Sequence, residues 1–412
     1  MNALPPVDSG CFVSHLECGG TGERHDANAL HNLSRAGHSL LVRYDLDRLK
    51  KTLKKSDLAA RAPDMWRYRE LLPMRRAADI VSLGEAMTPL IPLDGLAKEL
   101  GGGRILVKDE GRMPTGSFKA RGLAVAVSML KAFGAAHVAM PTAGNAGGAL
   151  AAYAARAGIK ATVFTPADTP DVTLREIGLY GADVLTVDGL IDACGRTVAQ
   201  GTPHVGWYDL STLKEPYRVE GKKTMGIEIV EQLGWRVPDV IFFPTGGGTG
   251  LIAMAKAFDE LEALGWIDSK RPRLVAVQST GCGPIVKAFD EGADHVAEPW
   301  APVTTDVPGV RVPKPFADRL ILKSLRATNG FGVAVDDAEV AATRLAVAKA
   351  EGVHLSPEGA ATVVAYKTAR KDGRIGAKDT AVLFNCASGQ KYPMPAAGRR
   401  LDVSKPIDWT AF

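Results

Sequence analysis

Residues 240–253 read VIFFPTGGGTGLIA, and this stretch decides the fold. Val240–Phe243 is a short apolar run of the kind that forms a buried strand, and Leu251–Leu264 repeats apolar residues at helical spacing. A glycine-rich turn joins the two segments. A buried strand that passes through a tight turn into a helix is the building unit of α/β proteins with parallel sheets.

The same alternation continues on both sides of this stretch. Buried strands are expected at 104–108, 137–140, 161–164, 183–187, 274–278, 333–335 and 381–384, with helices at 123–130, 146–156, 172–179, 191–200, 337–350 and 359–370. Residues 45–76 have the pattern of a charged helical stretch. The sequence therefore predicts an α/β protein whose parallel sheets are covered by helices on both faces.

Length, charge and cysteine content limit which classes of protein this sequence can belong to. The chain has 412 residues and a net charge of +4, and a chain of this length outgrows a single core, so two domains are expected. The densest basic runs are only Lys50-Lys51 and Lys54-Lys55, which argues against nucleic acid as a partner. The sequence has no apolar stretch long enough to span a membrane, and Met1–Gly10 lacks the pattern of a signal peptide. With five scattered cysteines, these features favour a cytoplasmic protein with reduced thiols.

The turn at Pro244–Gly250 indicates a phosphate site. Consecutive glycines leave backbone N–H groups accessible, and these donors at a helix start suit a phosphate group. Gly248–Ala253 also matches a dinucleotide fingerprint, but the next strand ends at Gln278 and not at the acid that a ribose needs. A nucleoside-triphosphate loop would require a Gly-Lys-Ser/Thr sequence, which does not follow.

Two further strand-to-helix turns are unusual. Lys119 lies in PTGSFKARG (114–122), where burial among small residues would lower its pKa toward neutrality, as a Schiff-base lysine requires. A solvated lysine on a first helical turn is the plain alternative. The turn PTAGNAGGA (141–149) places glycines and Asn145 at a helix start, which suits a carboxylate, although it also reads as an ordinary helix cap.

A phosphate site, a candidate Schiff-base lysine and a carboxylate loop together point to pyridoxal phosphate acting on an amino acid. The three motifs, in this order, resemble the threonine synthases of the tryptophan-synthase-β-like group, with fold type II, over residues 90–392. The resemblance implies an N-terminal extension (1–59), a large cofactor-binding domain (60–120 and 230–412) and a small mobile domain (121–229). It also implies a lyase of threonine biosynthesis that converts O-phospho-L-homoserine and water to L-threonine and phosphate, and a homodimer.

The resemblance also implies roles for single residues. Lys119 would form the internal aldimine and move protons. The other implied cofactor contacts are Phe118 on the ring, Asn145 at the phenolic oxygen, Gly246, Gly247, Gly248 and Thr249 at the phosphate, and Cys386 with Ser388 near the pyridine nitrogen. The implied substrate contacts are Thr142, Ala143 and Gly144 at the carboxylate and Arg218 at the phosphate, helped by Lys214, Lys222 or Lys223.

Some positions depart from the family pattern. Ala120 stands where threonine synthases commonly have an acid, and Thr212-Leu213 stands where they often have Asn-Ser. These departures keep a β-eliminating ammonia-lyase or a β-replacing synthase open as alternatives. A nicotinamide-dependent dehydrogenase and a non-catalytic relative are more distant ones. The N-terminal Cys and His residues (Cys11, His15, Cys18, His25, His31, His38) lack zinc-ligand spacing, so no metal is expected.

Overall fold

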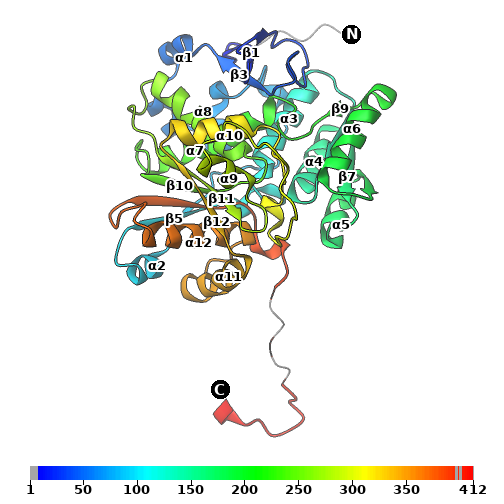
Figure 1. The fold of residues 1–412 in the computed structure, drawn as a ribbon. Coiled ribbons are helices and arrows are strands. Elements are labelled where there is room, and N and C mark those ends of the chain that lie inside the picture. Colours follow the sequence, from blue (N-terminus) through cyan, green and yellow to red (C-terminus); the bar gives the residue numbers. More distant parts are fainter. Residues whose placement is uncertain (1–7, 395–397, 399–400, 412) are drawn as a thin grey trace.

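The computed structural model describes residues 8–394, 398 and 401–411, and these residues contain three sheets (Figure 1). The expectation that the N-terminus carries no signal peptide falls largely on residues 1–7, which lie outside the described residues. None of the described helices combines the length and apolar character needed to cross a membrane.

The largest sheet has six strands in the order β12-β11-β10-β13-β5-β4. Their bounds are β4 Leu90–Pro92, β5 Arg104–Asp109, β10 Val240–Pro244, β11 Arg273–Ser279, β12 Phe331–Val335 and β13 Thr380–Asn385. All neighbouring pairs are parallel except β4 with β5, so the expected parallel sheet carries one short antiparallel edge strand.

Helices cover both faces of this sheet, as the sequence predicts. Alternate residues of β10 face different cores: Ile241 and Phe243 join one apolar cluster, and Val240 and Phe242 join the other. The first cluster includes α8 (Thr249–Ala263), α9 (Pro284–Asp290) and α10 (Asp318–Ala327). The second includes α2 (Asp94–Glu99), α11 (Asp337–Glu351) and α12 (Pro357–Lys371), which lie below the sheet in Figure 1.

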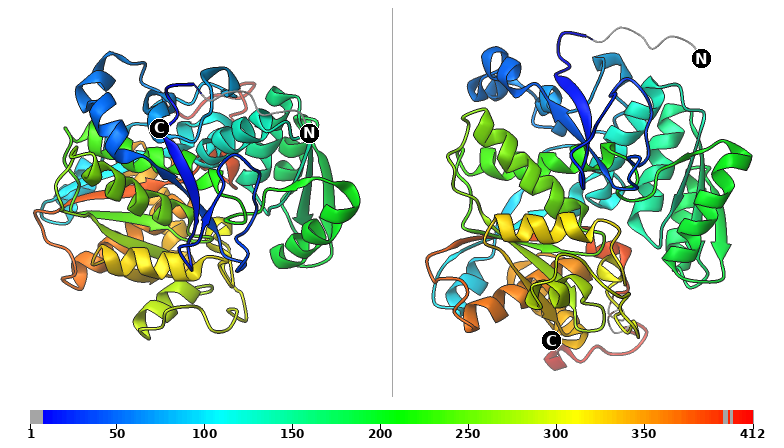
Figure 2. Two further views of the ribbon diagram at one scale, coloured as in Figure 1. Left: turned by 90° about the horizontal axis from the view of Figure 1, so that it is seen from above. Right: turned by 45° about the horizontal axis from the view of Figure 1, so that its top comes forward.

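A second, parallel sheet has the order β8-β7-β6-β9 and stands beside the first (Figure 2). Its strands are β6 His137–Pro141, β7 Lys160–Pro166, β8 Asp183–Val187 and β9 Tyr208–Asp209, and its helices are α4 Asn145–Ala157, α5 Asp171–Leu179 and α6 Ile191–Val205. The prediction that 183–187 is buried is wrong, because β8 is an edge strand and its Leu185 is 47% exposed.

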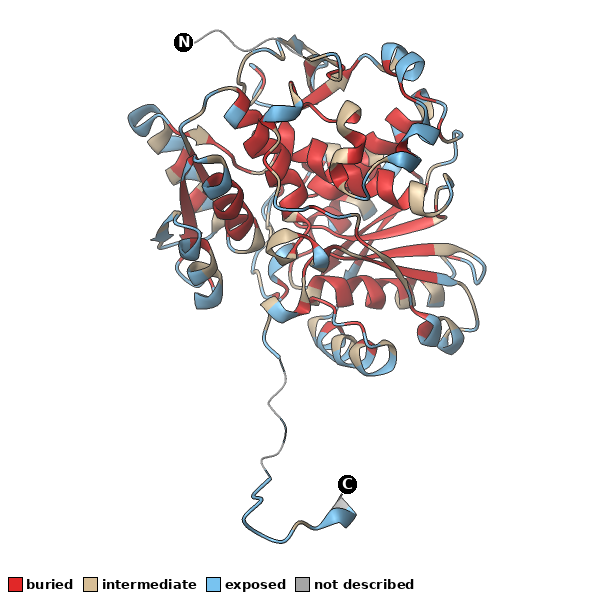
Figure 3. Ribbon diagram, turned by 180° about the vertical axis from the view of Figure 1, so that it is seen from behind, coloured by how far each residue is buried: buried red, intermediate tan, exposed pale blue. Residues whose placement is uncertain are grey.

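Two helices between the sheets are buried on nearly every face (Figure 3). They are α3 (Lys119–Ala132), which was expected, and α7 (Tyr217–Gln232), which was not. The predicted domain boundaries at 120/121 and 229/230 fall inside these helices, and the boundaries themselves stay a prediction.

The N-terminal residues form a small antiparallel sheet of β1 (Val13–Cys18), β2 (Arg24–His25) and β3 (Leu40–Tyr44). Within the expected helical stretch 45–76, only α1 (Leu46–Thr52) is α-helical, and the rest contains 3-10 turns. The Tyr44 hydroxyl donates to Glu220 at 2.7 Å, which ties this sheet to α7.

Candidate active site

Lys119 is the first residue of α3. The segment before it, Gly116–Phe118, is hydrogen-bonded at both ends to the segment Cys386–Ser388. The N–H of Phe118 donates to the carbonyl of Cys386 at 3.0 Å, and the N–H of Ser388 donates to the carbonyl of Gly116 at 2.8 Å. These two bonds join the segment after β5 to the segment after β13. Lys119 therefore lies where two neighbouring strands of the large sheet end, the usual place for a ligand in such sheets.

The Lys119 amine is partly buried, and its Nζ lies 4.0 Å from the centroid of the Phe118 ring. Burial lowers the pKa of Lys119 to about 8; Cys386 and Glu358 act against this shift, and Arg218 adds to it. At neutral pH a useful fraction of this amine is neutral, which is what a lysine needs to react with a carbonyl group.

The glycine turn after β10 has the geometry of an anion site. The N–H groups of Gly246, Gly247, Gly248 and Thr249 donate to no acceptor among the described residues, although all but Gly247 are buried. Buried N–H groups are nearly always paired, so four consecutive unpaired donors at the start of α8 call for a ligand that accepts hydrogen bonds. A phosphate group fits this donor set.

Close packing against neighbouring backbone fixes the conformation of the glycine turn. A Cβ on Gly246 would lie 2.4 Å from the carbonyl oxygen of Gly309, and Gly248 has a φ of 70°, in the left-handed region. Any side chain at Gly246 would collide with backbone, so the turn has space only for glycine there. A Cβ on Gly247 would be 3.2 Å from the Thr212 methyl group, which places residue 212 next to this turn.

The predicted carboxylate loop runs from Thr142 to Gly144 and enters α4 at Asn145. The Thr142 hydroxyl accepts from the Gly144 N–H at 3.2 Å, whereas the N–H groups of Ala143 and Asn145 donate to no acceptor in the described chain. The Asn145 side chain donates to the hydroxyl of Tyr392 at 3.1 Å. The loop thus has free donors and is connected to the segment that follows Cys386.

The two residues predicted near the pyridine nitrogen have different surroundings. Cys386 is 5% exposed, and burial raises the pKa of its thiol well above its usual value, with Lys119 acting against this. A thiol at this position is therefore neutral. The hydroxyl of Ser388 instead accepts from the N–H of Gln390 at 3.3 Å, as the cap of the next turn.

Arg218 and Lys222 lie one helical turn apart at the start of α7, and both are 1% exposed. An Arg218 guanidinium N–H donates to the carbonyl of Leu210 at 3.0 Å, and Arg218 has no ion pair in the described residues. Lys222 Nζ lies 5.3 Å from the Phe118 ring centroid. Lys119, Lys222 and Phe118 are thus brought together.

The other two candidate lysines lie elsewhere. Lys223 Nζ is 2.7 Å from both Glu220 and Glu260 in a buried cluster that contacts Tyr44. Lys214 Nζ lies 5.7 Å from the Phe316 ring centroid. Of the three lysines, only Lys222 contacts a residue next to Lys119.

Several residues that position the site were not found from the sequence. Arg121 forms buried ion pairs with Glu110 at 2.6 Å and Glu228 at 2.5 Å, and so fixes the first turn of α3. Buried Leu213 has a φ of 62°, and its carbonyl accepts from the Ser39 hydroxyl at 2.6 Å. For the ion pairs of Arg121, the sequence did hold a signal: an arginine two residues after the candidate lysine. The contact with Ser39 has no local signal, because 174 residues separate the partners.

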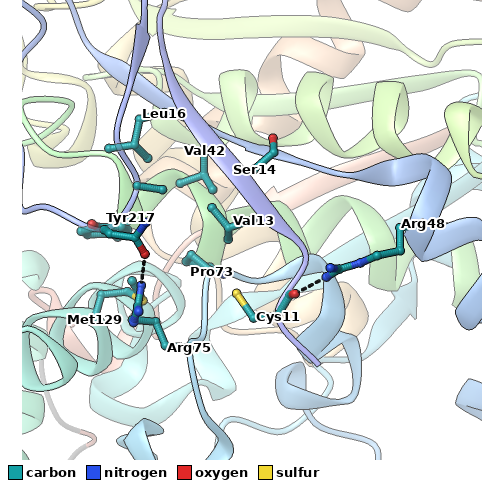
Figure 4. Close-up of a pocket in the computed structure, with 12 residues that line it drawn as sticks. Cys11, Val13, Ser14, Leu16, Val42, Arg48, Pro73, Arg75, Met129 and Tyr217 are labelled. Carbon is teal, nitrogen blue, oxygen red and sulfur yellow. Dashed lines mark hydrogen bonds between the residues drawn. The ribbon is translucent and has the colours of Figure 1, made fainter. Parts of the chain in front are cut away.

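A cavity of about 250 Å³ lies between the N-terminal sheet and the start of α7, and it contains none of the predicted site residues (Figure 4). Its walls include Cys11, Arg48, Arg75 and Tyr217, and Arg48 donates to the Cys11 carbonyl. In the described residues, no group of three or more His, Cys, Asp or Glu side chains is placed to hold a metal ion.

Comparison with known proteins gives close relatives along most of the chain. A family profile described as "Pyridoxal-phosphate dependent enzyme" matches residues 81–387. A threonine synthase of Methanocaldococcus jannaschii is 33% identical over 379 residues, which cover 92% of each chain. One from Methanosarcina acetivorans is 35% identical over 381 residues, covering 92% of this chain and 91% of that protein.

Solved structures share the fold at lower identity. Maize serine racemase superimposes with a TM-score of 0.64 and 20% identity, covering 80% of this chain and 94% of that chain. Threonine deaminase isoform 2 from Solanum lycopersicum gives a TM-score of 0.64 and 19% identity, covering 85% of this chain and 87% of that chain. At these identities the likeness concerns the fold alone.

Proposed function

The chain belongs to the pyridoxal-phosphate dependent enzyme family, and from this premise we propose that it is a threonine synthase acting on O-phospho-L-homoserine. The predictions of a two-domain α/β fold of type II and of pyridoxal phosphate as cofactor are confirmed. The choice of substrate is supported by two separate sets of groups that could bind anions: the unpaired backbone N–H groups of Gly246–Thr249, and the buried side chains of Arg218 and Lys222.

The first anion-binding group would hold the cofactor. The free N–H groups of Gly246–Thr249 suit its phosphate, and Lys119 is the amine that would bind its aldehyde carbon. Phe118 and Cys386 flank this amine, and Asn145 would contact the phenolic oxygen after exchanging its bond with Tyr392. When bound, pyridoxal phosphate supplies an electron sink conjugated to the α carbon of the substrate.

The second anion-binding group would hold the phosphate of the substrate. Arg218 is a buried cation and Lys222 a buried amine, and neither has a carboxylate partner in the described residues, so an anion that enters next to them would meet an uncompensated guanidinium and an amine without a hydrogen bond. The N–H groups of Ala143 and Asn145, with Thr142 and Gly144, would orient the substrate carboxylate.

Lys119 is the group that would move protons in this site. Its pKa of about 8 lets it take a proton from the α carbon and return one at neutral pH. The neutral Cys386 thiol would give the pyridine ring of the cofactor no carboxylate partner, which suits elimination and replacement more than transamination. Departure of phosphate from the γ carbon and addition of water at the β carbon then give L-threonine.

Phosphate release tests this proposal directly. The cofactor-loaded enzyme should convert O-phospho-L-homoserine to equal amounts of phosphate and threonine. Lys119→Ala should abolish turnover, whereas Lys131→Ala, which removes an exposed lysine of the same helix, should keep it. Release of ammonia and a 2-keto acid from threonine, without any phosphate release from the phosphoester, would instead identify an ammonia-lyase.

The proposal extends to the state of the protein in the cell. A cytoplasmic location agrees with the five free cysteines, and the absence of a nucleic-acid partner agrees with the small net charge. The homodimer is proposed from the family resemblance alone. Light scattering on the purified enzyme tests the dimer, since a monomeric mass would contradict it.

A further inference from the structure

Three buried lysines of this protein each have a glutamate partner. Lys108 Nζ lies 2.7 Å from Glu228, and Lys223 Nζ lies 2.7 Å from Glu220. Lys256 Nζ lies 3.0 Å from Glu220 as well. A buried ammonium is costly unless an opposite charge and hydrogen bonds compensate it, so each of these pairs is expected.

Lys222 differs from these three lysines. It is 1% exposed, yet it has no hydrogen bond and no ion pair to any described residue. Its amine points to the Phe118 ring, at 5.3 Å from the centroid, and the Lys119 amine lies 4.0 Å from the same centroid. The two unpaired amines therefore share one aromatic neighbour.

Helix packing holds Lys222 in this place. A Cβ on Gly122 would lie 3.2 Å from Lys222 Cε, and one on Gly221 would lie 1.9 Å from the carbonyl oxygen of Arg121. Because α3 and α7 touch backbone to backbone at this point, α7 has no freedom to turn Lys222 toward solvent.

Two cationic side chains, one carboxyl group and one thiol face Lys222. Burial lowers its pKa well below the usual value; Arg218, on the same helix, and Lys119, on α3, lower it further. Glu215, before α7, and the Cys386 thiol, after β13, act in the opposite direction.

Glu215 is not a free counter-charge for Lys222. Its carboxylate accepts from the backbone N–H groups of Tyr217 at 2.7 Å and Arg218 at 3.1 Å, at the start of α7. Burial raises the pKa of Glu215 to about 6. The negative charge that Lys222 lacks must come from outside the protein.

We propose that Lys222 is a neutral amine while the site holds no anion, and that it takes up one proton when a doubly charged oxyanion binds against it and Arg218. The inference rests on the proposed function only in naming the substrate phosphate as the natural anion. A dianion adds the opposite charge that the other buried lysines find in glutamates, and it thereby favours the ammonium form.

This behaviour selects the substrate class. A phosphoester brings the charge that converts Lys222 into a second cation, so the contact strengthens as the phosphate enters. A hydroxyl leaving group, as in serine or threonine, brings no charge and leaves Lys222 neutral. Lys222 therefore favours a phosphorylated amino acid over its free alcohol.

Proton counting with sulfate tests the inference. Sulfate is a dianion that does not titrate near neutral pH, unlike phosphate, so any proton taken up belongs to the protein. Calorimetric titration of the cofactor-loaded enzyme at pH 8, in two buffers of different ionisation enthalpy, should give about one proton taken up per sulfate bound. The proton could instead be taken up at the bond between Lys119 and the cofactor. That protonation would change the absorbance of the cofactor, which is recorded in parallel.

Substitutions of Lys222 test whether this side chain is the group that takes up the proton. Lys222→Met and Lys222→Gln should bind sulfate at least tenfold more weakly and take up no proton, and the second variant serves if the first does not fold. Glu215→Gln and the exposed-lysine control Lys131→Met should keep the uptake of one proton.

The inference is overturned if the wild-type enzyme binds no sulfate, binds it without proton uptake, or shows uptake that persists in both Lys222 variants. Turnover of O-phospho-L-homoserine is not part of this readout. An enzyme that fails to release phosphate, but takes up a proton through Lys222, would contradict the proposed function and leave this inference intact.

Discussion

Gly221 of α7 and Arg121 of α3 are in backbone contact: a Cβ on Gly221 would lie 1.9 Å from the carbonyl oxygen of Arg121. Lys119 precedes this contact by two residues on α3, and Lys222 follows it by one residue on α7. The helix crossing therefore sets the distance between the two unpaired amines of the site.

Gly221→Ala should push the two helices apart. Overpacking of a close-packed core costs about 1–3 kcal/mol, so the variant should unfold several degrees lower and hold less cofactor. Thermal unfolding and cofactor absorbance measure both effects. Gly178→Ala is the matched control, because Gly178 lies in α5 with no atom near its missing Cβ, and alanine there should be neutral or stabilising. An unchanged melting temperature for Gly221→Ala would contradict the contact.

Arg121→Lys should be strongly destabilising although it keeps the charge. The guanidinium contacts both Glu110 and Glu228 inside the protein, and a lysine replaces this fork with a single ammonium group. Leaving a buried carboxylate without its partner costs about 3–5 kcal/mol. Denaturant unfolding measures this loss.

The exposed ion pair of Arg175 with Asp171 supplies the control for that measurement. Arg175→Lys should change stability by less than about 0.5 kcal/mol, because exposed pairs contribute little. Equal effects of the two substitutions would show that the buried network does not hold α3.

The strand-to-helix turns at Lys119 and at Gly246–Thr249 were predictable because their signals are local. Gly246–Thr249 lies directly between β10 and α8, and Lys119 opens α3 after two short 3-10 turns that follow β5, so strand pattern, turn and helix pattern reinforce one another. The family resemblance added the roles of these residues.

Helix α7 was missed because its pattern is unlike that of a surface helix. Arg218, Lys222 and Glu228 are charged yet buried, so apolar residues do not recur on one face. Their burial depends on partners such as Lys108, which is 120 residues away from Glu228 in the sequence. The sequence pattern around α7 therefore cannot predict such a distant partner. The N-terminal sheet was also missed, because β1 pairs with β3, a strand distant in the sequence, and β2 has only two residues.

Ser39→Ala should weaken the site from a distance. The Ser39 hydroxyl donates to the carbonyl of Leu213, which has a left-handed backbone, and Thr212 lies next to Gly247 of the glycine turn after β10. Loss of this buried bond should cost about 1–3 kcal/mol and lower the affinity for pyridoxal phosphate. Cofactor titration of the apoprotein and thermal unfolding test both effects.

Ser56→Ala is the matched control for Ser39→Ala, because Ser56 is exposed and its hydroxyl makes only a 3.5 Å contact with Asp57. If Ser39→Ala loses stability but binds the cofactor as tightly as the wild type, the N-terminal segment stabilises the fold without supporting the glycine turn.

The rate at which the apoprotein binds pyridoxal phosphate should rise with pH and level off above a midpoint of about 8. In the proposed role of Lys119 only its neutral amine would attack the aldehyde, and burial lowers its pKa to about 8. Below this pKa the neutral fraction grows about tenfold per pH unit, and about one unit above it the rate is nearly constant. Stopped-flow absorbance from pH 6 to 10 gives the profile, and Lys119→Ala should develop no absorbance at any pH. A rate that still rises steeply at pH 10 would mean that the Lys119 ammonium is solvated like that of a surface lysine, and its burial beside Phe118 would then have no role in cofactor capture.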